Sequence, residues 1–438
     1  MPGCPPNEGA CPLVAAMEPT LPVHPTLMSN SLNPCIIEDG ASAQNPKCLP
    51  YVHIISGWHM FSDESLGWLK KLKAVETRTG LGCFDDWGEN DDGGRKWVSS
   101  FGKPPPTDTV IMTHCNKLLT WYPAFAGRYT SAWGKAYGPC KTTEMANLPK
   151  GVDYYATKMW QVCRPRALAA HDKAMGTGGA GKEATPPFVM KNVYGTRVRV
   201  ISALRSPVDR LETSFWGHRH YPIHYPPEKG GLRAYIAEQG AAFNDCAATH
   251  GSRRCAHLFE LLGEKYAAIF FHADQLIRGL YEPFIVDWHA AFGAESFLAV
   301  KVEALLDQPR ETRAKVLEFL GLPGAPPSSV DSVAPLPSAP AHSSAYKALH
   351  CGSLRASKAP PMDNQTRAAV EAFYKPHNAA LEKLLGWPKG SAWSQPTICT
   401  AADIAAATAV PTRRSMMDDQ PTDLGGLRLR SARERRRG

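Results

Sequence analysis

The stretch Val198–Phe215 (VRVISALRSPVDRLETSF) constrains the fold more than any other part of this sequence. Its first half is an apolar, β-branched run of the kind that forms a strand buried on both faces. Arg205-Ser206-Pro207 follows at once, and a proline suits the first turn of a helix over about residues 208–217. We therefore expect a strand–helix unit that places Arg205 at the carboxyl end of a strand, where open α/β sheets bind ligands.

The rest of the chain repeats this alternation of strands and helices. Short β-branched runs predict strands, and apolar residues spaced three or four apart predict helices. Such an alternation predicts an α/β fold in which a parallel sheet is flanked by helices on both faces. The expected strands are 51–56, 110–112, 198–204 and 297–302, and the expected helices are about 62–74, 208–217, 280–292, 310–320 and 365–385.

Three segments depart from this pattern. Residues 1–50 are rich in Pro, Ser and Asn, and about 166–188 contain a Gly-rich run, so we expect a disordered N-terminal segment and a flexible insertion. Residues 391–438 end in the basic stretch LRLRSARERRRG and are expected to form a disordered tail. A single domain over residues 51–390 remains, which is long enough for a sizeable core.

Charge and hydropathy narrow the class of protein. The formal net charge of +8 suits an enzyme whose substrates are anionic. Because a basic tail of this kind is usually solvated, no nucleic-acid partner is predicted. The sequence shows neither a run of about 18 apolar residues nor the apolar core of a signal peptide. No membrane anchor is therefore visible in it.

The 12 cysteines show no CxxC pair and no Cys/His spacing typical of zinc, so no metal site is predicted. They fit either reduced core thiols or secretory-pathway disulfides. Cys246 and Cys255 are the pair we expect, because the polar stretch between them (AATHGSRR) can close as a loop. Asn364-Gln365-Thr366 is a glycosylation sequon.

The end of the 198–204 strand is the first candidate site. Thr213 and Ser214 lie about two turns along the expected helix, so one of their hydroxyls can point back toward Arg205. A guanidinium and a hydroxyl together make a good phosphate clamp, because Arg offers bidentate, charge-assisted donors. The alternative is an arginine that forms a surface ion pair with Asp209 or Glu212.

The string RSPVDRLETSF resembles the 3′-phosphate-binding segment of sulfotransferases, Arg-x-Pro-x-x-Arg-x-x-Ser-x-(aromatic). Arg205, Pro207, Arg210 and Phe215 match that pattern, and Thr213 stands in place of its Ser. Downstream, the sequence is similar to carbohydrate sulfotransferases of the heparan and chondroitin type over about residues 195–390. The matching residues are Gly279-Leu280-Tyr281, Trp288, Phe292, Glu303, Phe319-Leu320-Gly321, Cys351, Pro360, Met362, Asp363, Phe373, Tyr374, Pro376 and Asn378.

The resemblance implies the P-loop-NTPase-like sulfotransferase fold and a second half-site near residues 57–65. In the family, a Lys-, Gly- and Thr/Ser-rich loop binds the 5′-phosphosulfate there. Here Met60 or His59 takes the lysine position, and Asp63 and Glu64 fall where hydroxyl residues belong. Ser62 and Ser65 remain as donors.

Two further family positions have changed. The family's base is a Glu in Lys-Glu-x-His-Phe-Phe-Asp, and Gly80 occupies that position, so the catalytic residue is unknown; Asp85, Asp86 and Glu76 are the substitutes. In place of the family's Lys-Gly-Arg loop, Arg355 and Lys358 are the available cations for the 3′-phosphate.

The resemblance implies transfer of a sulfuryl group from 3′-phosphoadenylyl sulfate to a carbohydrate hydroxyl, with no metal. A second interpretation is an inactive relative that keeps the fold and binds nucleotide or a glycan. The family also implies the Golgi and a glycan or proteoglycan acceptor. Since its members carry an N-terminal anchor that is not visible here, the chain is either soluble or a truncated sequence.

Overall fold

The computed structural model describes the central part of the chain and several shorter stretches. These are residues 26–27, 33–37, 46–57, 59–78, 101–102, 104–106, 109–115, 118–120, 131–147, 162–163, 165–167, 169–170, 173, 185–187, 190–191, 197–218, 220–259, 262, 265–266, 274–322, 344–393 and 397–408. Gly80, Asp85, Asp86 and most of the expected insertion lie outside them.

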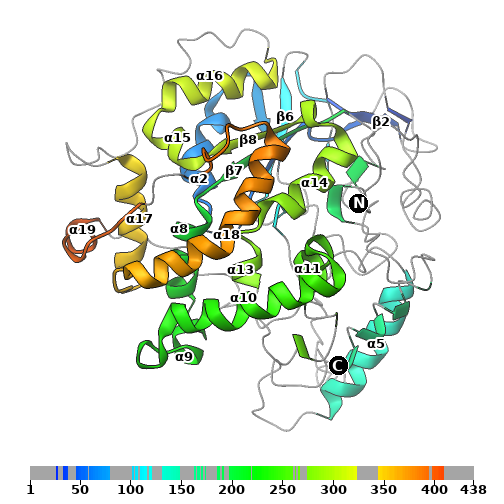
Figure 1. The fold of residues 1–438 in the computed structure, drawn as a ribbon. Coiled ribbons are helices and arrows are strands. Elements are labelled where there is room, and N and C mark those ends of the chain that lie inside the picture. Colours follow the sequence, from blue (N-terminus) through cyan, green and yellow to red (C-terminus); the bar gives the residue numbers. More distant parts are fainter. Residues whose placement is uncertain are drawn as a thin grey trace, which may run out of the picture.

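A five-stranded parallel sheet forms the centre of the molecule (Figure 1). Its order is β5 (Val75–Thr77), β6 (Val110–Cys115), β4 (Val52–Ile55), β7 (Arg199–Leu204) and β8 (Phe297–Lys301). The predicted parallel sheet flanked by helices is thereby confirmed. The sequence had not indicated β5.

Helices cover both faces of this sheet. Along β7, Val200 and Leu204 pack into one hydrophobic cluster, whereas Ile201 and Ala203 pack into the other. Figure 1 shows α15 and α16 on one side of the sheet and α10 and α13 on the other. The first side is built from α2 (Ser62–Leu66), η1 (Gly67–Lys71), α15 (Val302–Asp307) and α16 (Pro309–Leu320), and the second from α8 (Pro207–Gly217), α10 (Gly231–His250), α13 (Asp274–Ile277), α14 (Tyr281–Phe292) and α18 (Asn364–Leu385).

The helices after β4 and β7 lie on opposite faces. Leu66 of α2 packs into one cluster, and Leu211 and Phe215 of α8 pack into the other. Because β4 and β7 are neighbours, the chain diverges between their carboxyl ends. Open α/β sheets bind ligands at such a switch point. The fold thus predicts a binding site at the carboxyl ends of these two strands.

The remaining described elements surround this core. The expected 310–320 and 365–385 helices correspond to α16 and α18, and 62–74 corresponds to α2 and η1. The other elements are β1 (Thr26–Leu27), β2 (Cys35–Ile37), β3 (Lys47–Cys48), α5 (Ser131–Ala146), α9 (His220–His224), η4 (Pro227–Lys229), α11 (Ser252–Leu258), η6 (Ala294–Ser296), α17 (Ala345–Ala356) and α19 (Ala401–Ala406).

Two segments expected to be disordered contain ordered structure. β1, β2 and β3 form an antiparallel sheet within residues 1–50, which the Cys35–Cys48 disulfide ties together. Within 391–438, α19 is joined to α17 by the Cys351–Cys399 disulfide. These stretches therefore contain described elements inside segments expected to be disordered, and the disulfides supply cross-links that composition does not reveal. The domain boundaries themselves stay a prediction.

The expected Cys246–Cys255 disulfide is present, although not for the expected reason. The intervening residues are the end of α10 and the start of α11, which meet at Gly251 with a φ of 85°. A fourth disulfide joins Cys140 and Cys163. Within the part of the chain that the structure describes, no helix is both long and apolar enough to cross a bilayer.

Candidate active site

Arg205 lies at the carboxyl end of β7, as expected, and is fully buried. Its guanidinium donates to the Tyr346 hydroxyl at 2.8 Å, the His59 carbonyl at 2.8 Å and the Thr213 hydroxyl at 3.0 Å. A further contact of 2.6 Å joins it to Nδ1 of His350. Arg205 therefore ties the loop after β4 to helices α8 and α17.

These four partners of Arg205 carry no charge. Burial lowers the pKa of His350 to about 3, so its imidazole is neutral, and Nδ1 must accept from the guanidinium. The carboxylates lie one residue further out: Asp209 accepts from the Tyr346 hydroxyl at 3.0 Å, and Glu212 lies 3.3 Å from Nε2 of His350. The surface ion pair considered from the sequence is thus replaced by a buried network.

The structure distinguishes between the two candidate hydroxyls. Thr213 accepts from Arg205 and donates to the Asp209 carbonyl at 3.0 Å. Ser214 instead donates to the Leu211 carbonyl of its own helix at 3.0 Å, as hydroxyls inside helices often do. Thr213, and not Ser214, is brought together with Arg205.

The two downstream cations point elsewhere. The stretch that resembles a family loop is the end of helix α17, whose buried face presents His350 and Ser353 to Thr213. Arg355 is exposed and donates to the Ala405 carbonyl at the end of α19. Lys358 is also exposed, with a φ of 55°. Neither is gathered with Arg205, because Arg355 lies on the exposed face of α17 and Lys358 follows the end of that helix.

The loop after β4 is held tightly against its neighbours. A Cβ on Gly57 would lie 2.4 Å from the Thr120 hydroxyl, so only glycine permits this approach. His59 and Phe61 both have left-handed backbones, with φ of 62° and 53°, a conformation that costs non-glycine residues energy. The Phe61 ring covers the Arg205 guanidinium at 4.0 Å, a cation–π contact.

His59, which stands near the family's lysine position, faces another histidine. Its Nε2 lies 3.1 Å from Nε2 of His218, at the end of α8. Burial, together with the charges of His218, Arg210 and Arg205, holds the pKa of His59 well below its usual range. In this conformation His59 is therefore not a substitute cation.

Ser62, one of the two expected donors of this loop, contacts a histidine from the neighbouring strand. Nε2 of His114 on β6 lies 3.2 Å from the Ser62 hydroxyl, and Nδ1 lies 3.2 Å from the Asp63 carboxylate. Lys70 also pairs with Asp63, at 3.2 Å. Asp63, which stands where the family has a hydroxyl residue, is thus paired with two basic groups.

Several family-matching residues prove to be structural. Glu303 accepts from the Ser206 backbone N–H at 2.8 Å, and burial raises its pKa to about 7. A Cβ on Gly279 would lie 2.5 Å from the Tyr374 hydroxyl. The absence of a side chain at Gly279 therefore lets these two family-matching residues, which are distant in the sequence, come into contact. Tyr281 donates to the Arg205 carbonyl at 2.6 Å and fixes the end of β7.

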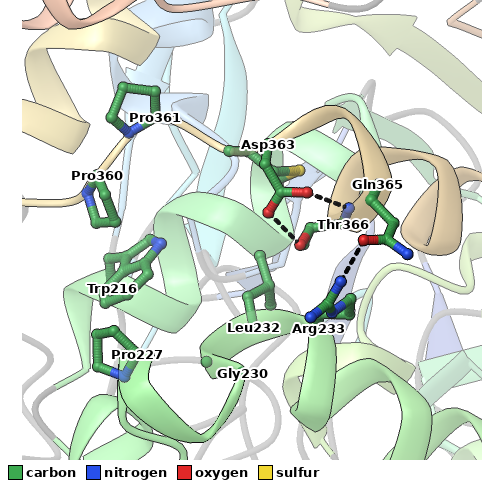
Figure 2. Close-up of a pocket in the computed structure, with 12 residues that line it drawn as sticks. Trp216, Pro227, Gly230, Leu232, Arg233, Pro360, Pro361, Asp363, Gln365 and Thr366 are labelled. Carbon is green, nitrogen blue, oxygen red and sulfur yellow. Dashed lines mark hydrogen bonds between the residues drawn. The ribbon is translucent and has the colours of Figure 1, made fainter.

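A pocket of about 380 Å³ lies beside the far end of α8 (Figure 2). Trp216 and Pro227 face Pro360 and Pro361 across it, and a hydrogen bond joins Arg233 to Gln365 at its rim. Since Trp216 follows Arg205 by eleven residues, helix geometry separates the two by on the order of 16 Å. No cluster of metal-ligating residues occurs among the described residues.

Sequence reasoning missed His114, Tyr346 and His350. His114 was missed because the strand was expected to end at residue 112, whereas β6 extends to Cys115. Tyr346 and His350 sit at a four-residue spacing on α17, and their ring centroids lie 6.2 Å apart. A helix-periodic Tyr-x-x-x-His pattern upstream of Cys351 was the one available signal.

No protein-family model matches the chain. Carbohydrate sulfotransferase 15 from Homo sapiens is 25% identical over 207 residues, which cover 46% of this chain and 33% of that protein. The match thus spans about a third of the relative's length. The predicted resemblance to carbohydrate sulfotransferases is confirmed at this modest identity.

Among solved structures, a sulfotransferase from Alicyclobacillus acidocaldarius superposes with a TM-score of 0.38 at 13% identity. The superposition covers 80% of this chain and 100% of that one. The fold assignment rests on the strand order of the sheet.

Proposed function

We propose that this carbohydrate-sulfotransferase-like chain transfers a sulfuryl group from 3′-phosphoadenylyl sulfate to a carbohydrate hydroxyl. One observation carries the proposal: the loop after β4 contacts both Arg205 of β7 and His114 of β6 at the switch point of the sheet. The two half-sites that lie far apart in the sequence are therefore neighbours. An inactive relative that only binds nucleotide or a glycan is the less favoured interpretation.

Arg205 is the group proposed to bind the nucleotide's 3′-phosphate, with Thr213 beside it. A buried guanidinium with neutral partners keeps its charge available to an anion, because no carboxylate among its contacts neutralises it. Phosphate binding requires the Phe61 ring and the His59 carbonyl to give way. The strained backbone of both residues favours their displacement by the phosphate.

The pocket beside Trp216 is proposed to bind a non-reacting sugar ring of the acceptor. Flat apolar faces from Trp216 and the prolines suit the C–H face of a sugar, while Arg233 and Gln365 at the rim offer hydrogen bonds. We expect Trp216→Ala to raise the KM for a glycan acceptor about tenfold without changing donor KM. Equal KM values for the acceptor in both proteins contradict this assignment.

A secretory-pathway location, in the Golgi, completes the proposal. The four disulfides in which the structure describes both cysteines fit an oxidising compartment. The sequon residue Asn364 is exposed at the start of α18, where glycosylation is sterically open.

The test combines nucleotide binding with turnover. We expect adenosine 3′,5′-bisphosphate to raise the melting temperature, and labelled sulfate to move from 3′-phosphoadenylyl sulfate to a glycan panel. Arg205→Lys, which keeps the charge but not the planar fork, should weaken bisphosphate binding about tenfold or more. No thermal shift at millimolar bisphosphate contradicts the proposal, and binding without transfer supports the inactive relative.

A further inference from the structure

His114, Asp63 and Ser62 form a hydrogen-bonded row that the family pattern does not contain. His114 is the fifth residue of β6, and its side chain is only 7% exposed. Its two ring nitrogens face different partners, with Nδ1 3.2 Å from Asp63 Oδ1 and Nε2 3.2 Å from Ser62 Oγ. The imidazole is therefore held in one orientation from both sides.

The proton positions along this row follow from its partners. A carboxylate only accepts, so Nδ1 of His114 carries the ring proton and donates it to Asp63. Nε2 then presents a lone pair to the Ser62 hydroxyl. Because Ser56 donates to the oxygen of Ser62 at 3.0 Å, the proton of Ser62 is directed at Nε2. The contacts run in the order carboxylate, imidazole, hydroxyl, as in catalytic triads.

The row lies at the same edge of the sheet as Arg205. Ser62 directly follows Phe61, whose ring covers the Arg205 guanidinium at 4.0 Å. Residue Ile54 of β4 is paired with His114 of β6, next to the strand pair β4–β7 that ends at Arg205. A substrate held by Arg205 and the loop after β4 therefore has Nε2 of His114 as its neighbouring base.

We infer that His114 is the general base of the sulfuryl transfer, oriented by Asp63; the inference rests on the proposed function. The acceptor hydroxyl takes the place of Ser62 as the donor to Nε2. Its oxygen bonds to sulfur as its proton passes to Nε2, and the bond from sulfur to the bridging phosphate oxygen breaks. Adenosine 3′,5′-bisphosphate departs with that electron pair, and Asp63 stabilises the imidazolium until its proton is released to solvent.

Three other glutamates that the structure describes are already engaged. Glu76, one of the substitutes considered from the sequence, binds Arg78 at 2.6 Å on the outer strand β5. Glu303 is buried against the Ser206 backbone, and Glu212 against His350. His114 thus supplies the base that glycine at position 80 does not.

The experiment compares turnover with nucleotide binding in three variants of the full chain. His114→Gln should lower kcat about 100- to 10,000-fold, with an unchanged Kd for adenosine 3′,5′-bisphosphate. Asp63→Asn should lower kcat about 10- to 100-fold at unchanged donor KM, because it acts only through His114. His224→Gln, at an exposed histidine of α9, is the matched control and should match wild type in both measurements.

A chemical rescue separates a base from a residue that only supports the fold. His114→Ala should regain turnover when imidazole is added, whereas Asp63→Asn should not. Wild-type-like turnover in His114→Gln, alongside an active wild type, overturns the base assignment and leaves the proposed function intact. A wild type that neither binds bisphosphate nor transfers sulfate overturns the proposed function, and the base assignment falls with it.

Discussion

The two halves of the candidate site differ in how far their polar groups are buried. At the end of β7, Arg205 is fully buried and every contact leads to another protein group, with Asp209 and Glu212 behind. At the ends of β4 and β6, His114 and Ser62 are nearly buried, but Asp63 keeps 30% of its side chain exposed. One half is closed into the fold, and the other opens toward solvent.

The half-site at β7 identifies the fold, whereas the proposed chemistry lies in the half-site at β4 and β6. The closed half keeps four residues of the family's motif, and all four are buried: Arg205, Pro207, Arg210 and Phe215. The open half has lost the family's lysine and glutamate, yet it holds the proposed base, His114 of strand β6, against Ser62 and Asp63 of helix α2. The matching motif therefore marks the buried half that is proposed to bind the 3′-phosphate, whereas the proposed base is identified by its contacts and not by a motif.

The substitution with the largest expected effect on stability removes Arg205. Arg205→Ala leaves the Tyr346 hydroxyl, the Thr213 hydroxyl and the His59 carbonyl without their shared donor. We expect a loss on the order of 4 kcal/mol in the free energy of unfolding, measured by urea titration with Trp fluorescence. Ser62→Ala, in the open half, should cost about 1 kcal/mol or less. Equal losses in the two variants would abolish the distinction between the halves.

The adjacent hydroxyls of α8 provide a finer test within the closed half. Thr213→Val keeps the shape but removes a hydroxyl that Arg205 donates to, so we expect a loss of about 2 kcal/mol in unfolding free energy. Ser214→Ala removes only a hydroxyl bound to its own helix and should cost about 0.5 kcal/mol. A larger loss in Ser214→Ala shows that the network is misassigned.

The sequence predicts the architecture far better than the site. Strand periodicity located β4, β6, β7 and β8, because strands buried on both faces are continuous apolar runs. It also placed Arg205 at the ligand edge. The partners of Arg205 were not predictable, since Tyr346 and His350 approach it across more than 140 residues of chain. Arg355 and Lys358 were chosen as the cations available in place of the family's Lys-Gly-Arg loop, but Arg355 lies on the exposed face of α17 and Lys358 follows the end of that helix.

The smallest expected effect is the pH dependence of stability, which again arises in the closed half. Burial raises the folded pKa of Glu212 and of Glu303 from 4.5 to about 7. An acid with a raised folded pKa stabilises the fold fully below its unfolded pKa and loses that contribution as pH rises through about 7. Together the two glutamates should therefore cost about 1.5 kcal/mol of stability between pH 6.5 and 8.

Buried histidines oppose this trend at lower pH. The pKa values of His53, His257 and His377 are lowered to about 4 by burial, and that of His350 to about 3, so their contributions are lost as pH falls below about 6.5. Stability should thus peak near pH 7, which a series of thermal melts measures. Glu212→Gln with Glu303→Gln should flatten the alkaline side, whereas Asp63→Asn in the open half should preserve it. An alkaline decline that survives the paired glutamine substitutions places its source outside the Arg205 network and removes the pH signature that separates the two halves.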